Sequence, residues 1–197
     1  MQKEFEVTSG SIVCSDPCYV IPTWCQGIVN NVKNGTWLAE VDMKNEGDWG
    51  IRVASLFIVN KVAFENEGEY PISERLLDFS QMNFNAGVDS GQFGFFDKEF
   101  YRNDESAKDL KKYEFGDNYD TQSGDTWYRA CSDLTLGDES WGVMPNGVVS
   151  TSGFGDGSYD VFGYKDNSGE YVAFSVVFIY ADEDDEDFEE EEEEIEE

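Results

Sequence analysis

Apolar residues recur along the first third of the chain in a pattern typical of β-strands. Residues 4–15 alternate loosely between apolar and polar positions and end at an Asp-Pro turn signal. In residues 27–43 an Asn-Gly pair separates two extended runs and predicts a hairpin. Residues 49–64 are apolar on both parities, which is expected of a central strand covered on both faces; a short helix is the alternative. Together these runs predict a three-stranded meander.

The rest of the chain alternates between strand patterns and short helical patterns. About ten short strands with one or two short helices predict a mainly β domain, either an antiparallel sandwich or an open, strongly twisted barrel. The longest surface loop is expected within 102–124. The predicted elements are helical turns in 71–80 capped by Ser73, a strand, glycine turn and strand in 83–97, a short helix in 105–112, a strand in 126–136, and hairpins in 141–152 and 158–180.

Charge narrows the function classes. The chain has 43 acidic and 13 basic residues, no histidine, and a formal net charge of −30. Fourteen of the acids lie in residues 182–197, so residues 1–181 still carry about −16. Direct binding to nucleic acid is disfavoured, because contacts with phosphates need Lys and Arg. Cations and basic protein surfaces are the favoured partners.

The same composition predicts the domain organisation. We expect one β-rich domain over residues 1–181 and an acidic tail over 182–197, which is disordered because its like charges repel and bury nothing. The first residues lack a signal-peptide pattern, and no segment has the roughly twenty apolar residues that span a bilayer. The expected location is the cytoplasm, without membrane contact, and the oligomeric state is left open. In that compartment the cysteines would be reduced thiols: Cys14, Cys18, Cys25 and Cys131.

Three glycines around one aspartate form the most patterned loop. Gly153, Gly155 and Gly157 surround Asp156. A phosphate loop needs a helix after its glycines, because the N–H groups of the helix bind the anion. Here a strand pattern follows, and Asp156 would repel an anion. The loop is therefore predicted to be a structural turn, in which glycine supplies positive φ or a bulge.

Four aspartates beside predicted turns are the main candidates for chemistry: Asp16, Asp89, Asp156 and Asp160. If the first three converged, their oxygens could bind Ca²⁺ or Mg²⁺ or share acid–base work. Turn aspartates more commonly hydrogen-bond their own backbone, and this interpretation is favoured. Without convergence no cofactor is expected.

The absence of histidine constrains catalysis further. It excludes a Ser-His-Asp triad and a histidine-activated cysteine. The cysteine spacing C-x3-C-x6-C is half of a usual zinc motif, so small buried side chains are favoured. The five tryptophans fall mostly beside turns; a ligand-stacking surface is one alternative, but places in the core are favoured: Trp24, Trp37, Trp49, Trp127 and Trp141.

Several blocks resemble known proteins. The Gly-Asp-Gly-x-Tyr loop at 155–159, with the hairpin after it, and Val-Asp-Ser-Gly at 88–91 are similar to a family of bacterial and phage proteins of unknown function. Asp-Pro-Cys-Tyr at 16–19 resembles a signature of small phage-encoded proteins. The resemblance implies a β-rich fold, allows a phage origin and carries no activity. It marks Asp16, Pro17, Cys18, Tyr19, Asp89, Ser90, Gly91, Gly155, Asp156, Gly157 and Tyr159; with Asp160 added, the polar members are the candidate binding residues.

Three classes of function follow from these patterns. The favoured hypothesis is a non-enzymatic, acidic binding protein that engages a basic protein, such as a host or defence factor. A more specific version of this hypothesis is that the chain mimics nucleic acid. The first alternative is a carboxylate-based, metal-dependent enzyme or metal-binding domain centred on the Gly-Asp-Gly loop. The second alternative is a virion-associated structural protein. A phage-encoded chain would act in the host cytoplasm.

Overall fold

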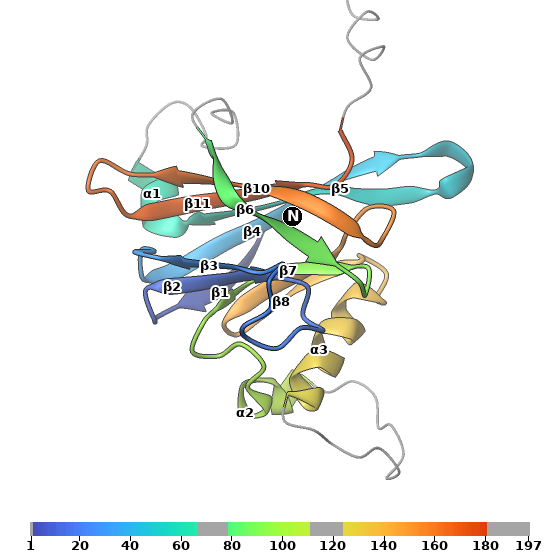
Figure 1. Cartoon of the computed structure of the whole chain (residues 1–197), viewed down its shortest axis with the longest axis horizontal. Coiled ribbons are helices and arrows are strands. Elements are labelled where there is room, and N and C mark those ends of the chain that lie inside the picture. Colours follow the sequence, from blue (N-terminus) through green and yellow to red (C-terminus); the bar gives the residue numbers. More distant parts are fainter. Residues whose placement is uncertain (1, 67–78, 111–123, 181–197) are drawn as a thin grey trace, which may run out of the picture.

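Antiparallel strands dominate the computed structural model, which describes residues 2–66, 79–110 and 124–180. They form two open sheets, seen as an upper and a lower layer in Figure 1, so the predicted mainly β sandwich is confirmed. The strands are β1 Lys3–Val7, β2 Ser11–Ser15, β3 Gly27–Asn30, β4 Gly35–Asn45, β5 Ile51–Asn60, β6 Ser80–Val88, β7 Gln92–Asp97, β8 Trp141–Met144, β9 Gly147–Thr151, β10 Gly157–Lys165 and β11 Tyr171–Val177. Their order is β1-β4-β5-β11-β10-β6 in one sheet and β3-β2-β7-β9-β8 in the other.

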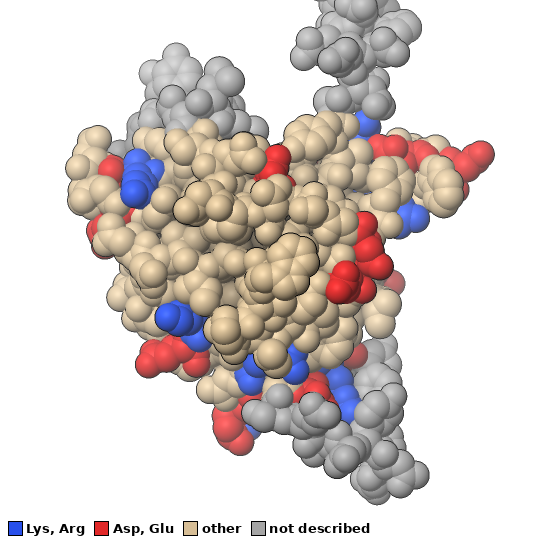
Figure 2. Space-filling view, viewed as in Figure 1, with Lys and Arg blue, Asp and Glu red and all other residues tan. Residues whose placement is uncertain are grey.

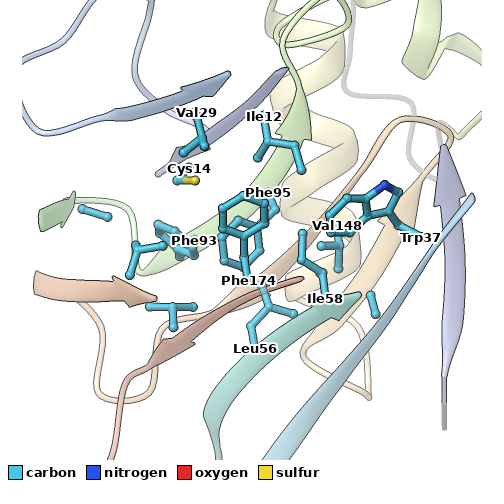
Figure 3. Packing of buried hydrophobic residues seen from close by; sticks show 14 of the residues in the cluster. Ile12, Cys14, Val29, Trp37, Leu56, Ile58, Phe93, Phe95, Val148 and Phe174 are labelled. Carbon is cyan, nitrogen blue, oxygen red and sulfur yellow. The ribbon is translucent and has the colours of Figure 1, made fainter. Parts of the chain in front are cut away.

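The inner faces of the two sheets share one aromatic core, shown in Figure 3. Phe95 of β7 stacks on Phe174 of β11 with ring centroids 5.9 Å apart, and Trp37 of β4 stacks on the same ring at 6.1 Å. Such buried rings supply most of the apolar area that holds two sheets together. The tryptophan prediction is confirmed for Trp37, Trp127 and Trp141, which are buried. It is wrong for Trp24 and Trp49, which are 95% and 69% exposed.

Short helices cover the outer faces. Helix α1 (Lys61–Asn66) packs on the six-stranded sheet through Ala63, and α2 (Asp104–Ala107) and α3 (Asp125–Thr135) cover the five-stranded sheet, as Figure 1 shows. Two 3-10 turns, Gly47–Trp49 and Lys108–Leu110, complete the helical structure of the described ranges. Within those ranges no helix has the length and apolar character needed to cross a membrane.

The chain changes sheet where the Asn34-Gly35 pair predicted a hairpin, so that prediction and the three-stranded meander are wrong. β3 pairs with β2, whereas β4 pairs with β1 and β5 in the other sheet. Asn31 adopts a φ of 60°, and Val32 donates to the carbonyl of Gly10 across the crossing. These local contacts replace the two-residue turn that would have kept both strands in one sheet.

The segment 126–136, predicted as a strand, is helix α3. Its buried residues are Trp127, Ala130, Cys131 and Thr135, which are spaced by three or four and therefore form one helical face. Asp104 accepts hydrogen bonds from the backbone N–H groups of Gly124 (2.8 Å) and Trp127 (3.0 Å) at the start of this helix. Aromatic and β-branched residues suggested a strand, but burial against the sheet decides for the helix.

The other predicted elements are largely confirmed. Residues 49–64 divide into the central strand β5 and the helix α1. The hairpins β8–β9 and β10–β11 form as expected, and α2 begins the helix predicted in 105–112. Of the expected meander, only the pairing of β4 with β5 forms. The helical turns predicted at 71–80 lie almost wholly outside the described residues, as does the tail 182–197.

Candidate functional site

A buried aspartate joins two turns that are far apart in the sequence. Asp16 follows β2 directly and is 0% exposed. Its Oδ1 accepts hydrogen bonds from the backbone N–H of Cys18 (2.8 Å) and the hydroxyl of Ser90 (2.7 Å). Its Oδ2 accepts from the backbone N–H groups of Asp89 (2.9 Å) and Ser90 (2.7 Å). Four donors therefore satisfy one carboxylate, and the turn after β2 is fixed against the turn between β6 and β7.

A second set of residues holds the carbonyl groups of the same turn. The Tyr101 hydroxyl donates to the carbonyl of Tyr19 at 2.8 Å and lies 3.1 Å from the carbonyl of Asp16. The Arg102 guanidinium donates through Nη1 to the carbonyls of Pro17 (2.8 Å) and Cys18 (3.2 Å). Each of these contacts ends on a backbone carbonyl, so the two residues position the turn.

The Cys18 thiol and the Tyr19 phenol, which follow Asp16 in this turn, have raised pKa values. Burial raises the pKa of the Cys18 thiol to about 12, with help from its hydrogen bond to Asp16 and from the charges of Asp16 and Asp89, whereas Arg102 acts in the opposite direction. The pKa of the Tyr19 phenol is also raised, by burial and then by hydrogen bonds to Asp89 and Cys25. A protonated thiol is a poor nucleophile and a protonated phenol cannot act as a base. The Cys18 thiol and the Tyr19 phenol are therefore not poised to act as a nucleophile or a base.

The glycine loop is a structural turn, as predicted. Gly153 and Gly155 have φ values of 62° and 114°, and strand β10, not a helix, follows them. The hydroxyl of Tyr159 lies 3.0 Å from the carbonyl of Ser152 and 2.8 Å from that of Gly155, and its ring packs edge-on against Phe178. The loop thus closes on its own backbone.

The structure brings five of the eight candidate binding residues together: Asp16, Cys18, Tyr19, Asp89 and Ser90. The glycine loop lies beside them, because Ser152 N–H donates to the carbonyl of Gly91 at 3.0 Å, but Asp156 in that loop is exposed. Asp160 lies in β10, where it accepts a hydrogen bond from Asn85 of the neighbouring strand β6.

The first three aspartates do not form an ion site in the described part of the chain. Both oxygens of Asp16 are occupied by N–H and O–H donors, which a cation would have to displace. Among the described residues no three His, Cys, Asp or Glu side chains gather in a group that could hold a metal ion. Two surface hollows lie elsewhere, one lined by Ser9, Ser11, Lys98 and Glu99, the other by Val41, Met43, Asp138, Glu139 and Trp141.

Sequence reasoning missed several residues that organise these turns. Asp97 is 0% exposed and repeats the role of Asp16, since its carboxylate accepts from the backbone N–H groups of Thr8, Ser9 and Glu99. Arg102 begins the segment 102–124, in which the longest surface loop is expected, and Tyr101 directly precedes it. Their signal is weak: an arginine in a chain with 13 basic residues, next to a tyrosine after a buried strand.

Comparison with known proteins places the chain in a family. A model of the family DUF4241, described as proteins of unknown function, matches residues 5–176, so the chain belongs to that family. This confirms the resemblance to a family of unknown function. Neither a curated protein nor a solved structure matches the chain.

Proposed function

We infer that this member of the DUF4241 family is a non-enzymatic binding protein that engages a basic protein through its negative surface. One observation carries the proposal: exposed charge in the described ranges is strongly one-sided. Eleven acidic residues are exposed there against three basic ones. The exposed acids are Glu4, Glu6, Asp42, Asp48, Glu65, Asp89, Glu99, Glu105, Asp138, Glu139 and Asp156; the exposed bases are Lys98, Lys108 and Lys165.

Several basic side chains of the body are already engaged by carboxylates or backbone carbonyls, so they add little unpaired positive charge to the surface. Lys33 pairs with Asp166 at 2.9 Å and Lys61 with Glu4 at 2.8 Å, while Arg102 is bound to backbone carbonyls. Figure 2 shows acidic side chains gathered at the projecting end of the β4–β5 hairpin. The acids of residues 182–197 add to this field whatever their arrangement. A field of one sign accelerates encounter with a partner of the opposite sign.

The network around Asp16 supports a binding protein over an enzyme. It contains buried polar groups, but they are hydrogen-bonded to backbone and stay protonated where they could react. In a phage setting the partner would be a host or defence factor, and rows of carboxylates could stand in for the phosphates of a nucleic acid.

The test uses the full chain and a labelled peptide of lysine and serine as the basic probe. Fluorescence anisotropy should show saturable binding that weakens as salt rises, because exposed charges are screened. A variant with Glu→Gln at positions 189–194 keeps the chain length and measures the share of the tail. A duplex DNA fragment, whose phosphates also attract lysine, should compete with the chain for the peptide if the acids mimic nucleic acid. No binding at low salt, or binding that salt does not change, would refute the proposal.

A further inference from the structure

A loop of exposed apolar side chains follows the Asp16 turn. We call residues 17–25 the Trp24 loop. Trp24 is 95% exposed, Val20 61% and Ile21 37%. Isolated apolar residues on a surface are common, but three within five positions of one loop form a patch of the kind that marks interaction sites.

The Trp24 loop is held in one conformation by hydrogen bonds at both ends and within it. At its start, Tyr101 and Arg102 bind the carbonyls of residues 17–19. Within it, Thr23 Oγ1 donates to the carbonyl of Val20 at 2.7 Å, and Thr23 N–H donates to the side-chain oxygen of Gln26 at 2.8 Å. At its end, the N–H of Gly87 donates to the carbonyl of Cys25 at 3.0 Å. A loop fixed before binding loses little conformational entropy on docking.

Charge restricts what can cover this loop. Residues 17–32 contain no charged side chain, although the chain as a whole carries −30. Nucleic acid and anionic membranes are repelled by that field, and so is a second copy of the chain. One exposed acid, Asp89, contacts the loop through Tyr19, and the chain as a whole is strongly negative. The occupant that fits both the apolar loop and this charge has an apolar face bordered by lysine or arginine.

We propose that the Trp24 loop is the apolar anchor of the partner-binding surface and that it receives a cationic amphipathic segment of another protein. This inference rests on the proposed function and adds the location and chemistry of the contact. Trp24 buries its ring against the apolar face of the partner segment, as tryptophan commonly does at the centre of interfaces. Asp89 then pairs with the basic border of that segment, and the net negative charge of the chain adds attraction at longer range.

The experiment compares two labelled peptides with the same number of lysines. In one the remaining residues are leucines placed with helical period, and in the other they are serines. The full chain should bind the lysine–leucine peptide at least about tenfold more tightly. Trp24→Ala should remove this difference and leave the lysine–serine peptide unaffected. Trp49→Ala is the matched control, because Trp49 is also exposed but lies on the β4–β5 hairpin, and it should change neither affinity.

Each outcome separates the two proposals. If Trp24→Ala binds the lysine–leucine peptide as the natural chain does, the anchor is refuted while the acidic binding function stands. If the natural chain binds neither peptide, the proposed function itself fails. Sedimentation velocity adds a third readout: a dimer of the natural chain that Trp24→Ala dissociates would identify a second copy as the occupant and overturn the proposal.

Discussion

Asparagine in place of Asp16 should weaken the fold far more than the change of one atom suggests. The amide nitrogen is a donor, and all four groups that face the carboxylate are donors as well. If the nitrogen took the place of Oδ2, it would oppose the N–H groups of both Asp89 and Ser90. If it took the place of Oδ1, the Ser90 hydroxyl could turn to accept, but the N–H of Cys18 would stay unpaired. The second arrangement is the less costly.

The expected loss follows from that arrangement. One buried, unpaired N–H costs about 1–3 kcal/mol, and two hydrogen bonds that lose a charged acceptor weaken by roughly 1 kcal/mol each. The asparagine variant no longer buries a charge, and this gain offsets part of the loss. We therefore expect Asp16→Asn to lower the free energy of unfolding by roughly 2–4 kcal/mol, a large share of the roughly 5–15 kcal/mol typical of a domain.

Urea unfolding followed by tryptophan fluorescence measures this loss as a lower midpoint with an unchanged slope. Asp156→Asn is the control, since Asp156 is exposed beside the same pair of turns and its change should cost less than about 0.5 kcal/mol. Equal stability of Asp16→Asn and the natural chain would contradict the assigned structural role of Asp16. So would an equal loss in the Asp156 variant, because the effect would then not depend on burial.

Three further predictions concern single groups. Burial acts to raise the pKa of Asp97, but hydrogen bonds from Thr8, Ser9 and Glu99 outweigh it and hold the pKa below its ordinary value. The stability that Asp97 contributes is therefore present above the unfolded-state pKa of about 4 and lost as pH falls through the folded-state pKa. Asp97→Asn should flatten the acid side of a plot of Tm against pH, and an unchanged plot would contradict this prediction. Because the pKa of Cys18 is raised to about 12, iodoacetamide at about pH 8 should label Cys18 slowly in the native chain and fast in the urea-unfolded chain. Mass spectrometry measures the labelling, and rapid labelling of Cys18 in the native chain would contradict a protonated thiol. Tyr101→Phe removes the donor to the carbonyl of Tyr19 and should lower the free energy of unfolding in urea by roughly 1–2 kcal/mol. The same variant should bind the lysine–leucine peptide more weakly. If neither the stability nor the peptide affinity fell, Tyr101 would have no role in holding the loop.

The sequence predicted those parts of the fold that local chemistry decides. The hairpins β8–β9 and β10–β11 have turn residues between strongly β-forming runs, and both form where expected. The glycine loop likewise follows from the missing helix after Gly157. Such signals lie within a few residues of the structure they predict, so no knowledge of the remaining chain was needed.

The same local signals fail where contacts between distant parts of the chain decide the structure. The Asn34-Gly35 pair has good hairpin chemistry, yet β3 and β4 belong to different sheets because each finds a better partner elsewhere. The residues of helix α3 have the pattern of a strand, because only the sheet beneath the helix makes Trp127, Ala130 and Cys131 a buried face. The grouping of Asp16 with Ser90 could be suspected from turn positions, but its hydrogen bonds span 74 residues, and Tyr101 and Arg102 gave no sign of completing it.

The reach of the Asp16 network has a consequence for the point in synthesis at which the Trp24 loop becomes fixed. Residues that fix the Trp24 loop are contributed from as far as Arg102, and Tyr101 is itself braced by Trp127 of α3 with ring centroids 5.0 Å apart. A nascent chain that has left the ribosome only up to β6 has synthesised Trp24 but not the groups that hold its loop. Presentation of the loop therefore requires the chain to be synthesised and folded through α3, and a shorter copy would not hold the proposed partner-binding loop in place.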